Sequence, residues 1–410
     1  MLLDPLFASL LPTLFVPLAL LIFLWSLYTA TIFVVGMRRY FGGYGEGESK
    51  PLSHTPFISL IVPAKDEERA IPRLLDSLID VEYPKEKMEI LIVEDGSSDR
   101  TGEICRRYAS NLPKLIRYFH RSVSSGKPAA LNFGLQEACG DIVGILDADS
   151  VPRRDLLRRV ATRFEKQEVI AIQGITQSMN AGVNMLTKIV SREEAVWLNT
   201  VLNGKDHLGL FVPLTGTCQF IRTEVLRRIG GWDEASLAED VELAVRLLES
   251  GHHVKFCEDV ISFQEAPSNL SQLFTQRLRW YRGYIETAIR YGTLLRNPSW
   301  SRVDAETYLL GPIVLSASFA NYLLSWAVFT YPATFLVDIL AGLMAGLTST
   351  LLVTVGFLLV YLVKPRKISS LLWLPFIYVY WFLQMSIATY ALFSVMLRRP
   401  RIWTKTEKTG

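Results

Sequence analysis

The stretch GDIVGILDADS, Gly140–Ser150, carries an apolar run that ends in two carboxylates. Its aliphatic segment Ile142–Leu146 predicts a strand covered on both faces, as in an α/β sheet. Asp is uncommon in strands, so Asp147 and Asp149 mark the exit into a loop. Ligands of open α/β sheets bind beyond such carboxyl ends, where two oxygen ligands suit Mg²⁺ or Mn²⁺ shared with a substrate's phosphates. Taken alone, these two Asp residues are more readily explained as part of a solvated turn, and the motifs that accompany them reverse that preference.

Short apolar runs alternate with helical stretches on both sides of this segment, over residues 57–265. This alternation predicts an α/β domain with a mainly parallel, mixed sheet and helices on both faces. The expected strands are Ile58–Val62, Ile90–Val93, Leu115–Phe119, Ile142–Leu146, Val169–Thr176 and Gln219–Arg222. The expected helices are Glu67–Ile79, Thr101–Ser110, Pro128–Ala138, Arg153–Phe164, Ala181–Leu202 and Asp240–Ser250.

Both ends of the chain are apolar. Residues 1–40 contain Leu11–Met37, which is long enough to cross a bilayer and is followed by Arg38 and Arg39, so we expect an anchor with the next segment in the cytosol. A signal peptide would be shorter and would follow a basic start. Residues 41–56 are expected to form a linker, residues 266–300 amphipathic interfacial helices, residues 301–398 about three membrane segments, and residues 399–410 a basic tail.

The three C-terminal membrane segments are expected at Tyr308–Tyr331, Thr334–Val363 and Leu371–Leu397. Their basic flanks do not agree on one topology, because Lys364–Lys367 and the tail both indicate the cytosol although a full span lies between them. Either the last segment is re-entrant or interfacial, or the tail is exceptional. The overall expectation is a multi-pass protein of the cell membrane with its catalytic domain in the cytosol.

Composition excludes some functions. The formal net charge is +3 over 410 residues, too small to indicate nucleic-acid binding, and no basic stripe alternates with aromatic residues. The four cysteines are widely separated and form no C-x-x-C pair, so neither a zinc site nor a disulfide framework is expected.

Four further motifs accompany Asp147 and Asp149, and each has a simpler explanation when it stands alone. Glu94-Asp95 ends a strand and fits a turn or a nucleotide contact. Lys127, at the start of a helix, fits a solvated side chain or an anion site. Glu239-Asp240 fits ordinary charge complementarity at a helix N-terminus. The segment QRLRW, Gln276–Trp280, fits a juxtamembrane amphipathic helix.

In this order, the five motifs resemble those of the family 2 glycosyltransferases, in particular the membrane-integrated branch with D, D-x-D, E-D and Q-x-x-R-W motifs. Cellulose, chitin, hyaluronan and poly-N-acetylglucosamine synthases and ceramide glucosyltransferase belong to that branch. The resemblance covers about residues 57–285 and the flanking membrane segments. Ala238 stands where Thr is common and Glu94 where Asp is usual, and no gating segment of the cellulose synthase type is found.

The resemblance implies a GT-A fold and an inverting hexosyl transfer from a nucleoside-diphosphate sugar, with uridine as the base by family habit. It implies that Asp240, with Glu239, is catalytic, and that Asp240 is ionised near neutral pH as the base. Asp149 and Asp147 would hold Mg²⁺ or Mn²⁺. The donor would meet Glu94, Asp95, Lys127 and Asp147, while the diphosphate and the acceptor would meet Gln276, Arg279, Trp280, Thr217 and Cys218.

Polysaccharide synthesis, with export of the chain through the C-terminal membrane segments, is the first functional expectation. The alternative is non-processive transfer of one sugar to a membrane lipid. The expected partners are therefore a sugar nucleotide, a polysaccharide or lipid acceptor, and the bilayer, with protein partners unknown. A transporter is disfavoured because Asp338 is the one ionisable residue inside the last three expected spans. A binding protein without turnover is disfavoured because base, metal ligands and diphosphate-neutralising residues are all present.

Overall fold

The computed structural model describes residues 5–42, 54–330, 335–361, 372 and 374–400. In this part of the chain, eight strands form one sheet in the order β3-β2-β1-β4-β7-β6-β8-β5. The strands are β1 (Ile58–Ala64), β2 (Met88–Asp95), β3 (Ile116–Arg121), β4 (Ile142–Ile145), β5 (Val151–Pro152), β6 (Ala171–Ser178), β7 (Gln219–Arg222) and β8 (Val254–Gln264).

The sheet has a parallel half and a mixed half. Strands β3, β2, β1 and β4 are all parallel, with Ile58 opposite Met88 in β2 and Ile142 in β4. Strand β7 then runs antiparallel to both β4 and β6, and β6 pairs with β8 in parallel. The predicted mainly parallel, mixed sheet is therefore confirmed. The sequence pattern predicts no strand at β8, because Lys255, Glu258 and Asp259 interrupt the apolar residues there.

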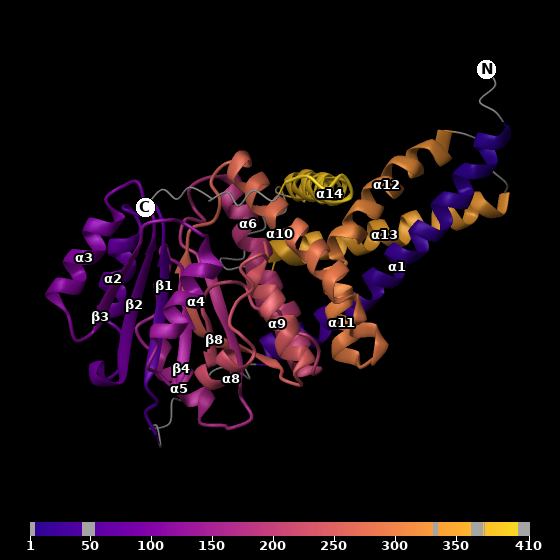
Figure 1. The fold of residues 1–410 in the computed structure, drawn as a ribbon. Coiled ribbons are helices and arrows are strands. Elements are labelled where there is room, and N and C mark those ends of the chain that lie inside the picture. The colour runs from indigo at the N-terminus through magenta and orange to yellow at the C-terminus, as the bar shows by residue number, and fades with distance from the viewer. Residues whose placement is uncertain (1–4, 43–53, 331–334, 362–371, 373, 401–410) are drawn as a thin grey trace.

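Helices cover the sheet and continue toward the membrane segments (Figure 1). Those of the sheet domain are α2 (Ile71–Ile79), α3 (Thr101–Asn111), α4 (Lys127–Glu137), α5 (Leu156–Phe164), α6 (Met185–Val196), α7 (Asn203–His207), α8 (Thr223–Arg228) and α9 (Glu239–Glu249). Short 3₁₀ turns, η1 (Lys85–Lys87) and η3 (Gly292–Arg296), and a π-helical turn, η2 (Trp197–Leu202), join some of them. The remaining helices are α1 (Pro5–Phe41), α10 (Leu270–Tyr291), α11 (Trp300–Leu309), α12 (Gly311–Thr330), α13 (Phe335–Tyr361) and α14 (Leu374–Met396).

The helix expected at Ala181–Leu202 begins later and is not uniform. It begins at Met185 because Asn184 caps it, with its side chain accepting from Thr187 N while Thr187 Oγ1 accepts from Asn184 N. The helix then loosens into the π-turn η2 before α7. A Cβ added at Gly204 would lie 2.3 Å from Ile32 O of α1. Gly204 therefore allows the backbones of α7 and α1 to contact each other where the two helices cross.

Two apolar clusters fill the two faces of the sheet. One includes Ile61, Val143 and Val241, and brings α4 and α9 onto its face. The other includes Leu60, Leu74 and Val160, and brings α2 and α5 onto the opposite face. Because both faces of β1 and β4 are covered, their side chains form continuous apolar runs, which explains why the sequence signal at residues 142–146 is strong.

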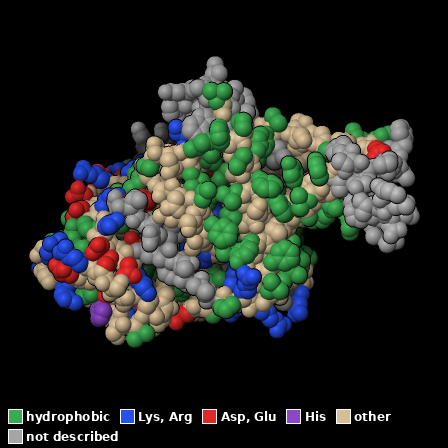
Figure 2. Space-filling view, turned by 90° about the horizontal axis from the view of Figure 1, so that it is seen from above, with side chains coloured by type: hydrophobic (Ala, Val, Ile, Leu, Met, Phe, Trp, Pro, Cys, Tyr) green, Lys and Arg blue, Asp and Glu red, His purple; other side chains and the backbone are tan. Residues whose placement is uncertain are grey.

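Among the described residues, two helical stretches have the length and hydropathy of a membrane span: Thr13–Phe41 and Pro375–Met396. A third is obtained if α11 and α12, which meet at a bend of 54°, are counted as one broken span. In Figure 1, α1, α12 and α13 extend together away from the sheet domain, and Figure 2 shows hydrophobic side chains gathered over these helices, with charged ones at the opposite end. The predicted basic run 364–367, residues 401–410 of the predicted tail, and most of the predicted linker lie outside the described residues.

Asp304 of α11 joins the membrane helix α1 to the sheet domain. Its carboxylate is almost fully buried and accepts hydrogen bonds from Tyr28 of α1 at 2.6 Å and from Phe211 N at 2.8 Å. Lys205 of α7 lies 2.7 Å from both carboxylate oxygens. Residues from four segments thus contact one buried ion pair, which holds α1 in place against the sheet domain.

Candidate active site

The Asp-Ala-Asp segment lies at the carboxyl end of β4, where Lys127 crosses over it. The Nζ atom of Lys127 is 2.6 Å from Asp147 Oδ1, 3.7 Å from Glu239 Oε1, and donates to Gly216 O at 2.9 Å. Burial alone would lower the pKa of Lys127, but Asp147 and Glu239 outweigh it and raise that pKa above its ordinary value. Lys127 is therefore a fixed cation inside an acidic cluster, and not a solvated side chain.

Asp95 shapes the loop that delivers Lys127. Its buried carboxylate pairs with Arg121 at 3.0 Å, and it accepts hydrogen bonds from Ser124 Oγ at 2.7 Å and Gly126 N at 2.9 Å. Gly126 has a φ of 91°, which a side chain would disfavour, and Pro128 follows in the first turn of α4. Asp95 also lines the cavity described below. Asp95, which is predicted to contact the donor, thus also holds the N-terminal end of α4 in place.

Glu94 is turned into the protein. Its carboxylate is bonded to His120 and to Ser97 N, and Tyr118 donates to it at 3.3 Å. Burial alone would raise the pKa of Glu94, but the hydrogen bonds from Ser97 and His120 outweigh it and lower that pKa. Glu94 does not line the cavity that the other site residues share. Its oxygens already have protein partners, and its direct contact with the donor stays a prediction.

Glu239 and Asp240 form the first turn of α9, facing Lys127 and the loop at Gly216. Desolvation and the neighbouring charge of Glu239 raise the pKa of Asp240 to about 7, and Lys127 and Arg279 counteract that shift only in part. A pKa of about 7 leaves Asp240 about half ionised at neutral pH, because loss of water and a second carboxylate oppose the stabilising effect of the helix N-terminus. Asp240 titrates in the range in which a general base works best.

The loop Thr215–Cys218 divides into residues that face the site and residues that support it. Gly216 has a φ of 81°, and a Cβ added there would lie 3.0 Å from Asp240 Oδ2 and 3.3 Å from Lys127 Nζ. Thr217 Oγ1 accepts from Asp147 N at 3.1 Å, so it braces the Asp-Ala-Asp turn from below. Cys218, predicted as an acceptor contact, is instead fully buried against Val260 O, because its own φ of 51° turns the side chain into the core.

Helix α10 brings the Q-x-x-R-W segment to the same place from the membrane side. Gln276, Arg279 and Trp280 all line the cavity, and the charge of Arg279 reaches Asp240. Arg277, which the motif leaves unspecified, is buried and pairs with Glu193 of α6 at 3.0 Å. Its guanidinium lies 4.5 Å from the centre of the Trp280 ring, a cation–π contact.

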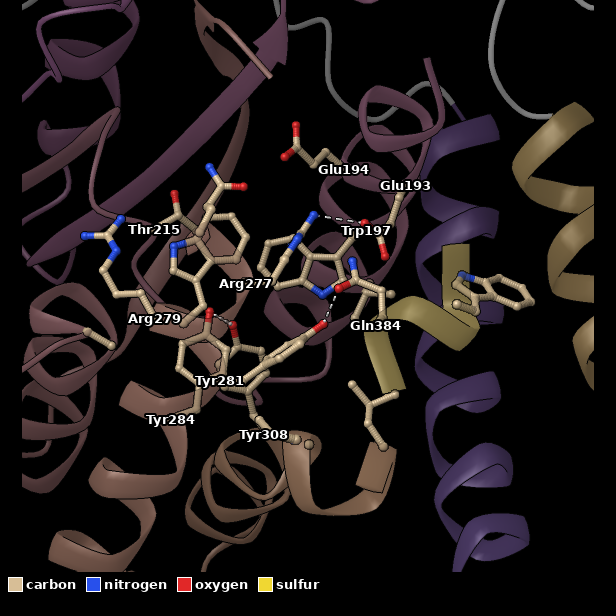
Figure 3. Close-up of a pocket in the computed structure, with 18 of the residues that line it drawn as sticks. Glu193, Glu194, Trp197, Thr215, Arg277, Arg279, Tyr281, Tyr284, Tyr308 and Gln384 are labelled. Carbon is tan, nitrogen blue, oxygen red and sulfur yellow. Dashed lines mark hydrogen bonds and ion pairs between the residues drawn. The ribbon is translucent and has the colours of Figure 1, made fainter. Parts of the chain in front are cut away.

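One cavity of about 1830 Å³ connects these groups. At one end lie Lys127, Asp147, Asp149 and Asp240. The other end runs along α10 to apolar side chains of α1 (Ile22, Trp25 and Phe33), of α12 (Val314) and of α14 (Val379 and Phe382). Figure 3 shows Thr215 and Arg279 on one side of the cavity and Glu193, Arg277 and Gln384 on the other.

Sequence motifs did not point to several residues that line this cavity: Glu193, Glu194, Trp197, Tyr284 and Tyr308. A weak signal exists for three of them, because Glu193 and Glu194 lie four and three residues before Trp197 and so share a face of one helix. Nothing local identifies Tyr308, which meets Trp197 and Tyr284 only after α11 has folded back onto α10.

The residues present fit a divalent ion that a substrate completes. Among the described residues, no group of three or more His, Cys, Asp or Glu side chains is arranged to hold a metal by itself. Asp147 and Asp149 nonetheless supply hard oxygen ligands at a strand end, the usual partial set for Mg²⁺ or Mn²⁺ shared with phosphates. Desolvation raises the pKa of Asp147, and the charge of Asp149 adds to this although Lys127 opposes it, as expected where carboxylates crowd together.

Residues 55–283 match the sequence model of the family described as glycosyltransferase like family 2, which is more than half of the chain. The chain belongs to this family. The GT-A fold is supported by the mannosyltransferase PcManGT of Pyrobaculum calidifontis, solved with GDP-Man and Mn²⁺, which aligns with a TM-score of 0.65 at 20% identity over 95% of this chain and all of the other. The predicted family and fold are confirmed.

Curated relatives of this glycosyltransferase differ in what they make. The probable glycosyltransferase YdaM of Bacillus subtilis is 30% identical over 57% of this chain and 56% of its own length. The β-monoglucosyldiacylglycerol synthase of Trichormus variabilis is 30% identical over 65% of this chain and 58% of its own. The poly-β-1,6-N-acetyl-D-glucosamine synthase of Staphylococcus epidermidis is 27% identical over 57% and 56%. The chain thus matches little more than half the length of these relatives, which include makers of a glycolipid and of a polysaccharide.

Proposed function

We propose that this protein transfers a single sugar from a nucleoside-diphosphate sugar to a hydroxyl group of a membrane lipid. The observation that supports this most is the cavity itself, which runs without interruption from Asp240 and the Asp-Ala-Asp turn to apolar side chains of α1, α12 and α14. A lipid would bind in this cavity with its headgroup beside Asp240 and its tail among α1, α12 and α14, because burial of a hydrocarbon tail against apolar side chains is favourable.

In the proposed reaction Asp240 takes the proton of the acceptor hydroxyl as that oxygen attacks the anomeric carbon. The bond from this carbon to the diphosphate breaks, and the nucleoside diphosphate leaves with the electron pair. Lys127, fixed 2.6 Å from Asp147, and Arg279 would neutralise the leaving charge. Attack opposite the leaving group would invert the anomeric configuration.

Asp149 and Asp147 would hold Mg²⁺ or Mn²⁺, which when bound supplies positive charge to the diphosphate. The similarity to a fold neighbour solved with Mn²⁺ supports this assignment. The Asp95 loop would keep the N-terminus of α4 and Lys127 aimed at the same phosphates. We also propose that the sheet domain faces the cytosol, where sugar nucleotides are found, in agreement with the basic pair Arg38-Arg39 after α1.

A polysaccharide synthase is the second candidate, and one observation favours it: a relative named as a poly-β-1,6-N-acetyl-D-glucosamine synthase matches the same domain. A polymer is hydrated, however, and would need polar walls along its path. The lining of this cavity is instead mainly apolar, with side chains such as Ile22, Phe33 and Val379 outweighing polar ones such as Ser318 and Asn321. The geometry therefore favours the lipid acceptor.

The test uses the full chain in lipid nanodiscs, Mn²⁺ or Mg²⁺, and a panel of radiolabelled UDP- and GDP-sugars. Products are extracted into organic solvent and sized by gel electrophoresis. We expect one organic-soluble product carrying a single labelled sugar from one donor. High-molecular-weight product from that donor would establish the polysaccharide synthase, and the absence of transfer from every donor, in nanodiscs made from total membrane lipid, would contradict both candidates.

A further inference from the structure

The side chains along one wall of the active-site cavity indicate which kind of lipid headgroup it binds. We call the acceptor end the part lined by α6, η2, α10, α11 and α14, with the residues Glu193, Glu194, Trp197, Arg277, Tyr281, Tyr284, Tyr308 and Gln384. Figure 3 shows these side chains around a common space, apart from Thr215 and Arg279 on the donor side.

The charges of the acceptor end are two carboxylates and one guanidinium, and the guanidinium is already matched. Arg277 pairs with Glu193 at 3.0 Å, donates to Tyr380 at 3.3 Å, and has one face over Trp280. Tyr380 also bonds to Glu193, and Gln384 donates to Tyr380 at 2.6 Å. The charge of the guanidinium is thus matched by Glu193, while its buried Nε has no hydrogen-bond partner among the described residues. The two carboxylates of the acceptor end therefore outnumber its one cation.

Glu194 adds a second carboxylate beside this network, where Ser178 donates to it at 3.1 Å. A carboxylate accepts hydrogen bonds and donates none. It therefore binds well to hydroxyl groups, which donate, and repels a phosphate group, which carries the same sign of charge. The acceptor end has the chemistry for a neutral, hydroxyl-rich headgroup.

Aromatic rings form the rest of this wall. Trp197 and Tyr308 stack with centroids 6.4 Å apart at an angle of 29°, and Tyr284 lies 5.3 Å from Tyr308. The phenol of Tyr308 donates to that of Tyr284 at 3.2 Å, and Tyr281 donates to Gln384 at 3.1 Å. Rings with polar tips of this kind present both an apolar face and hydrogen-bonding groups, which suits the two sides of a sugar ring.

We propose that the acceptor end binds a lipid whose headgroup is an uncharged sugar and that it excludes lipids headed by a phosphate. This inference rests on the proposed function, since it specifies the acceptor of the same site. Glu193 has two effects at the acceptor end. Its carboxylate neutralises Arg277, and its negative charge repels anions. Replacing it with Gln leaves the guanidinium without its ion pair and so relaxes the exclusion.

The test measures lipid binding directly. Protein in a neutral detergent is mixed with equal amounts of monoglucosyldiacylglycerol and phosphatidic acid, which have the same diacylglycerol tail, and the bound lipids are counted by native mass spectrometry. We expect the wild-type chain to retain the glucolipid at least about tenfold over phosphatidic acid, a readily measured difference in dissociation constant. Glu193→Gln should reduce this preference by at least about threefold. Glu103→Gln, the same change on the exposed face of α3, should leave it unchanged.

Equal or stronger binding of phosphatidic acid to the wild-type chain would overturn the inference, as would an unchanged preference in both Glu193→Gln and Glu194→Gln. Glu194→Gln is the second variant because it removes a carboxylate without breaking the ion pair with Arg277. Failure of the two proposals is distinguishable. A glucolipid preference without sugar transfer from any donor would contradict the proposed function alone, whereas transfer to a hydroxyl group of phosphatidylinositol would support that function and overturn the headgroup inference.

Discussion

Lys127 Nζ lies 2.6 Å from Asp147 Oδ1, so one of the two carboxylates expected to hold a metal is already paired with a lysine from the start of α4. Asp147 is therefore shared between a protein cation and any ion that binds with the donor. Before the donor binds, Lys127 would compete with a metal ion for Asp147. After the donor binds, Lys127 and the metal ion would both neutralise the diphosphate.

Lys127→Met should separate these two effects. We expect the dissociation constant of the donor nucleotide to rise by at least about tenfold, because a charge-assisted contact to the diphosphate is lost. Binding of Mn²⁺ without nucleotide should become stronger, because Asp147 is released. Titration calorimetry measures the first and Mn²⁺ electron paramagnetic resonance the second. Lys114→Met, at an exposed lysine, is the control; weaker Mn²⁺ binding in Lys127→Met would refute the competition.

Asp240→Asn should abolish the proton acceptor while leaving the donor site in place. We expect sugar transfer to fall by at least about a hundredfold, the usual scale for a lost general base, with nucleotide affinity changed little. Product formation and calorimetry of the same samples check this. Asp80→Asn, at an exposed surface ion pair with Arg154, is the matched control. Transfer at the wild-type rate in Asp240→Asn would show that another group takes the proton.

The dependence of activity on pH follows from the raised pKa of Asp240, which is about 7. The base must be deprotonated, so the competent fraction falls from about nine-tenths one unit above this pKa to about one-tenth one unit below it. We expect kcat/KM to rise with pH up to a plateau near pH 8. A profile flat from pH 5.5 to 8 would mean that the carboxyl titrates at its ordinary value.

Gly216→Ala should both strain the backbone and crowd Asp240, and a control variant separates these two effects. The residue has a φ of 81°, and a methyl group there would lie 3.0 Å from Asp240 Oδ2. Gly209→Ala has a similar backbone cost, with a φ of 65°, but opens onto free space. Both variants should lose about 1 kcal/mol of stability, and Gly216→Ala alone should lose activity, by about tenfold or more. Equal activities would show that the base does not need this gap.

Asp304→Asn should loosen the joint between α1 and the sheet domain. It removes the partner of the buried Lys205 and the acceptor of the Tyr28 hydroxyl, so we expect a loss of about 3–5 kcal/mol in the free energy of unfolding. Tyr28→Phe, which removes one hydrogen bond and no charge, should cost about 1 kcal/mol. Thermal unfolding in detergent measures both. Equal effects of the two substitutions would contradict the dominance of the ion pair.

Local sequence was sufficient for the strands β1, β2 and β4 and for helices α3 and α4, because burial on both faces and clear helix boundaries leave a signal in neighbouring residues. It failed at β8, whose polar residues Lys255, Glu258 and Asp259 hide the apolar pattern. The family resemblance also implied an acceptor contact for Cys218, whose side chain is instead buried in the core at a backbone φ of 51°.

By itself the sequence determined the α/β class, the family and the candidate carboxylates, because these depend on residue type and short spacings. Only the tertiary structure decided that Lys127 closes on Asp147, that Glu94 faces inward, and that Asp240 titrates near neutrality. It also brought Glu193, Arg277 and Tyr308 together from α6, α10 and α11 around one cavity. Such contacts join positions as many as 187 residues apart, as between Glu193 and Tyr380, and no local pattern encodes them. They depend on how the helices pack against the sheet, which is a property of the whole chain.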